Sequence, residues 1–220
     1  MNSKYKLVVF DVDGTLLNTE EGVLSSAKYA IAKMGFEIPS EKILKSFIGP
    51  PIQDSFERVF HIHGAERALM SSLFRNHYKN VDLFKAKPYS GIYEMLNLLR
   101  QSGYQIAIAT YKREDYALRI TEHFGFDRYT DIICGSDFGG KLTKSDIIQL
   151  AIKKSGMDNS EAIMVGDTMQ DAVGAQKEQI KFIAVTYGFG FKPGDVLAEG
   201  FCLGMAHGTQ DIYDIIRKGK

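Results

Sequence analysis

The chain has 220 residues, 45% hydrophobic and 25% charged, a length that supports one large core or one core with a small accessory domain. Its 27 basic residues balance its 27 acidic residues, so charge gives no reason to expect a nucleic-acid polymer or a membrane surface as partner. The first apolar run is too short for a signal peptide or a membrane span, which makes a cytoplasmic protein the expectation. The two cysteines are too few for a disulfide framework.

The apolar run at residues 7–10 predicts a buried strand, and two carboxylates follow it directly. Side chains at i and i+2 leave an extended backbone on the same face, so Asp11 and Asp13 are expected in one crevice at the carboxyl end of the strand. Two anions this close favour a hard cation such as Mg²⁺. Gly14 allows a tight turn, and Thr15 offers a hydroxyl and an N–H group to an anion. The alternative is a plain turn, because Asp and Gly are common turn residues.

The next part of the chain is predicted to be all-helical. Apolar residues recur at helical spacing, without strand-like alternation, in residues 23–34, 41–47, 52–60 and 66–81. The Gly-Pro-Pro sequence at residues 49–51 interrupts this pattern. We interpret residues 18–83 as a helical cap domain inserted into an α/β catalytic core of residues 1–17 and 84–220.

From residue 88 onward, strands and helices alternate. The pattern predicts helices at residues 91–102, 113–124, 145–155 and 171–177, and strands at residues 105–110, 132–134, 162–165 and 182–185. This rhythm indicates a doubly wound parallel sheet of the Rossmann type, covered by helices on both faces. The glycine-rich segment 187–191 is either a mobile rim of a pocket or a plain connection.

Further polar residues stand at the same expected edge of the sheet. Thr110 ends a predicted strand and can donate its hydroxyl to a phosphate oxygen, while Lys144 opens a helix as a positive charge facing phosphate. Asp167 follows a strand as a third oxygen ligand for Mg²⁺, and Asp171 lies where a carboxylate suits a helix start. Each has a plain alternative as a strand-end hydroxyl, a surface cation or a helix cap. Their shared edge favours one site.

Together these residues resemble the four motifs of the haloacid dehalogenase superfamily, at residues 11–15, 110, 144 and 166–171. The helical insertion resembles the branch of phosphoglycolate phosphatases, β-phosphoglucomutases and 5′-nucleotidases. The resemblance implies that Asp11 is the nucleophile and Asp13 the acid/base. It makes Thr110 and Lys144 phosphate-binding groups. It also implies Mg²⁺ ligands from the side chains of Asp11 and Asp167 and the main-chain carbonyl of Asp13.

The resemblance further implies a Mg²⁺-dependent phosphomonoester hydrolase that acts on a small phosphorylated metabolite, such as phosphoglycolate or a nucleoside 5′-monophosphate, through an aspartyl-phosphate. A phosphosugar mutase of the β-phosphoglucomutase type and a catalytically silent phosphometabolite-binding protein are the alternatives. Hydrolysis is favoured because residues 139–143 lack the Lys-Pro pair often found in mutases. Substrate contacts are expected near Glu20, Gly49 and Tyr111, with Asp171 in support, although a simple turn between helices is the alternative for Gly49. A monomer or a weak homodimer is expected.

Overall fold

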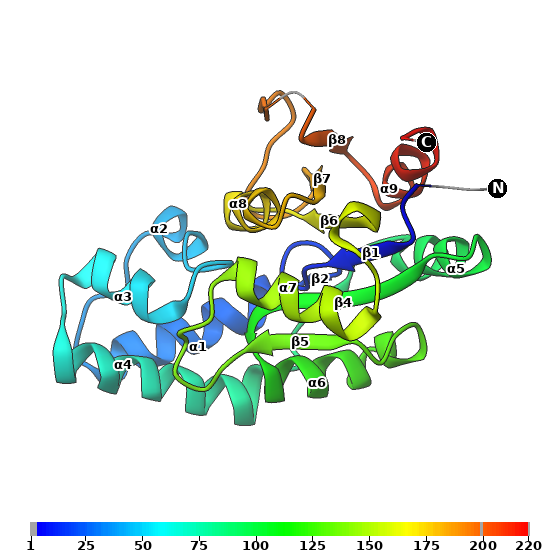
Figure 1. Cartoon of the computed structure of the whole chain (residues 1–220). Coiled ribbons are helices and arrows are strands. Elements are labelled where there is room, and N and C mark those ends of the chain that lie inside the picture. The colour runs from blue at the N-terminus through cyan, green and yellow to red at the C-terminus, as the bar shows by residue number, and fades with distance from the viewer. Residues whose placement is uncertain (1–3, 199, 220) are drawn as a thin grey trace. The chain divides into compact units, whose positions relative to one another are not determined.

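The computed structural model describes residues 4–198 and 200–219, and the chain divides into two compact units, Met1–Leu17 with Pro88–Lys220, and Asn18–Lys87 (Figure 1). The sequence predicts that the helical unit ends at residue 83, four residues earlier than in the structure. Residues 84–87 stay with the helical unit because the Gly22 amide donates to the Lys85 carbonyl oxygen at 3.0 Å and Lys85 Nζ lies 2.8 Å from Asp82 Oδ1. The roles of the two units as catalytic core and cap stay predictions.

The first unit is built on a six-stranded parallel sheet with the order β5-β4-β1-β6-β7-β8. The strands are β1 Leu7–Phe10, β4 Gln105–Arg113, β5 Ile133–Ser136, β6 Ala162–Gly166, β7 Lys181–Val185 and β8 Cys202–Ala206. From β1 the chain adds strands first on one side and then on the other. Ligands bind at such a switch point in open α/β sheets, beyond the carboxyl ends of the strands.

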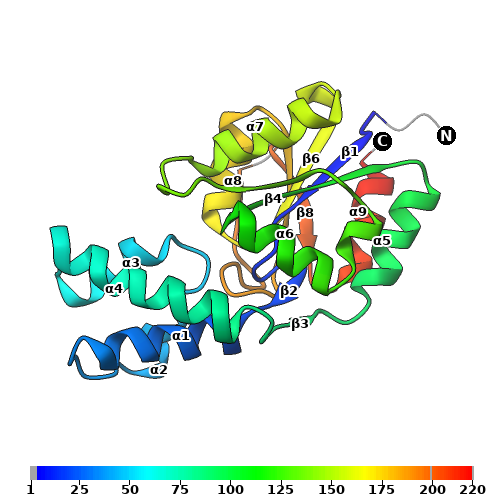
Figure 2. The same cartoon turned by 90° about the horizontal axis from the view of Figure 1, so that it is seen from below.

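Helices cover both faces of this sheet, as Figure 2 shows. They are α5 Ile92–Gln101, α6 Glu114–His123, α7 Lys144–Ser155, α8 Met169–Lys177 and α9 Thr209–Lys218, with 3₁₀ turns at Phe126–Arg128 and Asn159–Glu161. Helices α7 and α8 pack against each other on one face, whereas α5 packs against α9. The chain moves outward from β1 through β4 and β5 and then returns past β1 to β6. Because crossovers between parallel strands are right-handed as a rule, this reversal of direction puts helices on both faces.

The core of the sheet explains why β1 carries no polar alternation. Leu7 and Val9 pack in a cluster with Ile148 of α7, and Val8 and Phe10 are equally buried on the opposite face. Burial of one such large side chain stabilises the fold by about 1.5–3 kcal/mol. The central strands are therefore held firmly, and the polar residues that follow them take fixed positions.

The second unit is helical and contains α1 Glu20–Lys33, α2 Glu41–Lys45, α3 Ile52–Phe60, α4 Gly64–His77 and a π-helical turn at Tyr78–Asp82. Helix α4 packs against α1 and α3, and the ring of Phe56 contacts the rings of Phe47 and Phe74 edge-on. The segments that join the two units pair as two short strands, β2 Leu17–Asn18 and β3 Lys87–Pro88. Within residues 4–198 and 200–219, no helix has the length and apolar character to cross a membrane.

The α/β core and the helical insertion confirm the predicted fold class. Strand β8 and helix α9 lie beyond the last predicted strand. Strand β8 has only five residues, with Gly204 at its centre, so its sequence offers no long apolar run, and most of its length is only partly buried. The strand predicted to end at Thr110 continues to Arg113. Its register against β5 shifts between Ala109 and Arg113, where Arg113 pairs with Ser136, so Thr110 lies inside β4 and not at its end.

Candidate active site

The register of the central strands brings the polar residues to one edge of the sheet. Phe10 of β1 pairs with Val165 of β6, and the Asp11 amide continues this ladder by donating to the Val165 carbonyl oxygen at 3.0 Å. Asp167 follows two residues after Val165. Thr110 follows two residues after the β4 partner of Phe10. These residues therefore stand at nearly the same level of three neighbouring strands.

Lys144 lies between two buried carboxylates. Its Nζ atom is 2.5 Å from Asp11 Oδ1 and 2.6 Å from Asp171 Oδ1, and its side chain is only 3% exposed. Burial lowers the pKa of Lys144, but the two carboxylates outweigh burial and raise that pKa above its ordinary value. The ammonium group therefore stays charged at neutral pH. Helix α7 starts at Lys144 because Thr143 and Asp146 form a capping box.

Asp11 is the carboxylate that this lysine faces. It is 6% exposed. Burial raises the pKa of Asp11 to about 7, with Lys144 acting against burial and the carboxylates of Asp171 and Asp13 adding to it. In the metal-free protein Asp11 therefore titrates near neutral pH. Additional positive charge at this position would keep it ionised.

Asp171 is held by the first turn of α8. Its Oδ2 atom accepts hydrogen bonds from the Thr168 amide at 3.0 Å and from the Thr168 hydroxyl at 2.6 Å, in a capping box at the helix start. Its Oδ1 atom faces Lys144. Both oxygens are thus engaged, which fixes the carboxylate and the ammonium group beside it.

Asp167 is fully buried, and its two oxygens have different surroundings. Oδ2 accepts from the amides of Phe189 at 2.8 Å and Gly190 at 3.3 Å. Oδ1 is buried without a hydrogen-bond partner among the residues that the structure describes. Burial raises the pKa of Asp167 well above its ordinary value, the neighbouring carboxylates of Asp171 and Asp11 raise it further, and the two amides act against the rise.

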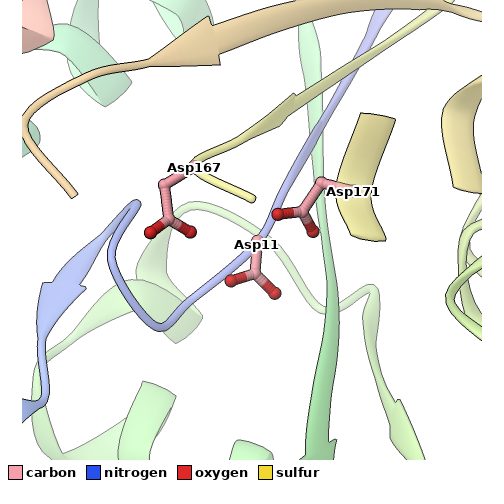
Figure 3. A group of neighbouring side chains, drawn as sticks. All are labelled: Asp11, Asp167 and Asp171. Carbon is pink, nitrogen blue, oxygen red and sulfur yellow. The ribbon is translucent and has the colours of Figure 1, made fainter. Parts of the chain in front are cut away.

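These side chains fit a divalent cation. Asp11, Asp167 and Asp171 each offer one carboxylate oxygen, and these oxygens lie within 4.8 Å of one another. Figure 3 shows the carboxyl groups side by side, carried by the ends of β1 and β6 and by the first turn of α8. Hard cations such as Mg²⁺ take carboxylate oxygens, and the unpartnered Oδ1 of Asp167 is a ready ligand atom. The predicted ligand set used the main-chain carbonyl of Asp13, whereas this carboxylate cluster includes Asp171.

Asp13 faces a lysine that the sequence analysis did not single out. Lys112 Nζ lies 3.2 Å from Asp13 Oδ1, and these side chains are 5% and 15% exposed. Lys112 belongs to β4, and its amide donates to the Thr110 hydroxyl oxygen at 3.2 Å. One signal in the sequence could have identified Lys112. It lies two residues after Thr110, as Asp13 lies two residues after Asp11, and residues with this spacing in an extended chain share a face.

Thr110 and Tyr111, which are adjacent in β4, make different contacts. Thr110 is buried and contacts the amide of Lys112. The Tyr111 hydroxyl accepts from the Lys144 amide at 2.9 Å, and its ring centroid is 5.7 Å from Lys144 Nζ. Tyr111 therefore supports the first residue of α7. Its contact with substrate stays a prediction.

Gly14 and Thr15 form the turn after β1. Gly14 has φ of +82°, and a Cβ atom at this position would lie 2.1 Å from Asp167 Oδ2. Glycine is therefore required both by the turn and by the close approach of Asp167. The Thr15 hydroxyl is buried and lacks a hydrogen-bond partner within the described ranges, and the Thr15 carbonyl oxygen accepts from the Tyr187 hydroxyl at 3.0 Å.

The remaining predicted residues, Glu20 and Gly49, belong to the unit of residues 18–87. Glu20 forms an ion pair with Lys45 at 3.0 Å, and Gly49 has φ of +101° between α2 and α3. A positive φ at this break favours glycine. Their contacts with substrate stay predictions.

The arrangement suits phosphoryl transfer. A buried carboxylate beside a fixed ammonium group can act as a nucleophile toward phosphorus, because the ammonium group offsets negative charge on the phosphoryl oxygens. A second carboxylate, Asp13, lies two residues away for proton transfer. The carboxylate cluster supplies oxygen ligands for a cation that would offset the remaining repulsion.

Comparison with known proteins adds independent findings. A family model described as haloacid dehalogenase-like hydrolase matches residues 8–185. A 5′-nucleotidase from Pseudomonas aeruginosa is 32% identical over 188 residues, which cover 85% of this chain and 85% of that protein. A phosphoglycolate phosphatase from Agrobacterium fabrum is 32% identical over 189 residues, covering 83% of this chain and 81% of that protein. The crystal structure of a predicted phosphatase from Clostridium acetobutylicum is 32% identical, with a TM-score of 0.90 and coverage of 97% of this chain and 99% of that chain.

Proposed function

The chain belongs to the haloacid dehalogenase-like hydrolase family and is a phosphatase, and from that premise we propose that it is a Mg²⁺-dependent phosphomonoester hydrolase acting through an aspartyl-phosphate on Asp11. The proposed substrate is a small phosphorylated metabolite of the phosphoglycolate or nucleoside 5′-monophosphate type. Two relatives with names of such enzymes support this choice.

The observation that carries the proposal is the contact of Lys144 with Asp11 inside a buried carboxylate cluster. A lysine buried between carboxylates stays protonated and orients the nucleophile. A surface lysine or a plain helix cap would not need this burial. The geometry therefore supports a charged, water-poor site for an anionic substrate.

In the proposed reaction, a carboxylate oxygen of Asp11 attacks phosphorus, and the bond between phosphorus and the ester oxygen breaks. Asp13 donates a proton to the leaving alcohol. Asp13 then accepts a proton from the water that attacks the aspartyl-phosphate, which releases phosphate and restores Asp11. Lys144 and the Thr110 hydroxyl bind the phosphoryl oxygens.

A divalent cation held by Asp11, Asp167 and the main-chain carbonyl of Asp13 would offset the repulsion between the nucleophile and the phosphate. Asp171 keeps Lys144 in place from the opposite side. Glu20 and Gly49 are proposed to select the alcohol part of the substrate. A Glu20→Gln variant that raises KM while kcat is kept would support this role.

Phosphate release from a panel of phosphomonoesters tests the proposal. We expect release from phosphoglycolate or a nucleoside 5′-monophosphate in the presence of Mg²⁺, loss of release with a chelator, and recovery when Mg²⁺ is restored. The Asp11→Asn variant is the matched control, since it keeps the size of the side chain and removes the nucleophile. Absence of release from every ester of the panel, with the wild-type protein folded and Mg²⁺ bound, would contradict the proposal.

Labelled phosphosugars separate hydrolysis from transfer within the sugar. Hydrolysis puts the labelled phosphoryl group on water as free phosphate. A label that stays on the sugar at a new position would instead indicate a mutase. Sedimentation of the purified protein tests the expected monomer or weak homodimer.

A further inference from the structure

Asp167 is held by hydrogen bonds from residues 187–191, a segment that follows β7. The amides of Phe189 and Gly190 donate to its Oδ2 atom, and its carbonyl oxygen accepts from the Phe191 amide at 2.8 Å. The side chain and the main chain of Asp167 are thus both held by the same short segment. Neither the location nor the direction of these amides follows from the sequence pattern.

Both ends of the segment are anchored. The Tyr187 hydroxyl donates to the Thr15 carbonyl oxygen, and the side chain of Phe191 is buried with its ring centroid 6.0 Å from that of Phe182. Burial also raises the pKa of Tyr187, so its hydroxyl remains a donor at physiological pH. The segment therefore forms a fixed support and not a free rim.

Glycine at positions 188 and 190 is required by space. A Cβ atom on Gly188 would lie 2.3 Å from the Gly14 carbonyl oxygen and 2.5 Å from Asp167 Cβ, and one on Gly190 would lie 2.3 Å from the Asp167 carbonyl oxygen. Neither glycine has φ in the left-handed region. The backbone angles alone give no reason for glycine here, whereas the close approach to Asp167 does.

We propose that residues 188–190 are a positioning element for the divalent cation, which fixes Asp167 so that Oδ1 faces the ion. The inference rests on the proposed function in one respect, since it takes a cation at this site as given. Oδ2 is saturated by two amides, and Oδ1 has no hydrogen-bond partner among the described residues. A carboxylate free to rotate would have to be ordered when the ion binds, and this segment removes that requirement.

The test measures Mg²⁺ binding by calorimetry without substrate, so that it does not depend on turnover. We expect Gly188→Ala and Gly190→Ala to weaken Mg²⁺ binding by about 10- to 100-fold, the usual effect of losing groups that orient a metal ligand. Gly208→Ala is the matched control, because a Cβ atom there meets nothing within 4 Å and φ is −145°. Its Mg²⁺ affinity should equal that of the wild type.

A second variant covers the case in which an alanine prevents folding. Replacing Phe189 by phenyllactic acid changes one amide to an ester and deletes the N–H donor to Oδ2 without adding a Cβ atom. We expect weaker Mg²⁺ binding in this variant also, with kcat recovered at saturating Mg²⁺. A structural role alone would change stability and leave the Mg²⁺ affinity of the folded protein unchanged.

The outcomes separate this inference from the proposed function. Wild-type affinity in the phenyllactic acid variant and in the folded alanine variants would overturn the positioning role and leave the hydrolase proposal intact. A wild-type protein that releases phosphate but binds no Mg²⁺ would overturn both the cation requirement and this inference. Weaker binding confined to the variants that disturb Asp167 supports the role.

Discussion

Replacing Lys144 by methionine removes the ammonium group that lies between two buried carboxylates and keeps most of the apolar length of the side chain. In the wild type this group is 2.5 Å from Asp11 and 2.6 Å from Asp171. Removal of one partner from a buried ion pair leaves charge without compensation and destabilises a protein by about 3–5 kcal/mol. We expect a loss of this size in the free energy of unfolding of the metal-free protein above neutral pH.

The loss should depend on pH in a defined direction. Because the pKa of Asp11 in the folded protein is about 7, above its unfolded value, ionisation of Asp11 lowers stability as pH rises toward 7. Lys144 lowers that pKa, so in Lys144→Met the pKa rises further and the decline continues above pH 7. The difference between the two proteins should therefore grow by about 1.4 kcal/mol per pH unit above pH 7 until the new pKa is passed.

Urea unfolding at about pH 6 and about pH 8.5, with a chelator present, measures this difference. Lys153→Met is the control, since Lys153 is an exposed residue of the same helix and its loss should change stability by no more than about 0.5 kcal/mol. In the presence of Mg²⁺ and substrate, Lys144→Met should lower kcat by about 100- to 1000-fold. An equal and small destabilisation at both pH values would refute the assignment of Lys144 as the counter-charge of Asp11.

Three further predictions concern the same site. Asp11→Asn should lower kcat by about 10⁴-fold or more, measured by single-turnover phosphate release, while circular dichroism shows that the fold is kept. A near-normal rate would show that Asp11 is not the nucleophile. The apparent affinity for Mg²⁺ should fall by at least about tenfold per pH unit below pH 7, because burial raises the pKa of Asp11 and of Asp167 and the protons they hold must leave before the ion binds. Calorimetry that shows a flat profile from pH 5 to 7 would contradict the raised pKa of Asp11. Lys112→Met should slow hydrolysis of alkyl phosphates about tenfold more than hydrolysis of p-nitrophenyl phosphate, because it disturbs Asp13, and proton donation by Asp13 matters most for poor leaving groups. Lys112→Arg, which keeps the positive charge, should retain activity. Equal losses of rate on both esters would show that Lys112 has no part in proton transfer.

Much of the fold could be predicted because its signals are local. The apolar run before Asp11 marks a buried strand, and glycines after helices mark their ends. Helix α7 begins one residue before its predicted start, at Lys144. Strand β8 could not be identified in the same way, because Gly204 interrupts its apolar pattern. Its position is set by pairing with β7, which lies about 20 residues earlier in the sequence.

The candidate site was predictable in its residue types more than in its contacts. The sequence predicts Asp11, Asp167 and Lys144 because they follow strands or open a helix at one edge of a parallel sheet. The sequence does not predict Lys112, because its place in the site comes from a contact between β4 and the turn after the neighbouring strand β1, where Asp13 lies. Segment 187–191 carried two possible interpretations, and its close approach to Asp167 favours a fixed support.

Local sequence patterns predict the order of strands and helices up to β7 and the chemistry of the polar groups, since burial patterns, turns and helix caps depend on neighbouring residues. Which of these groups come into contact depends on the tertiary structure. Lys144 reaches Asp11 across 133 positions, and only one oxygen of Asp167 is saturated by amides from the segment after β7. Such contacts depend on the register of strands that are not adjacent in the chain and on the path of the loops between them, which no local pattern encodes.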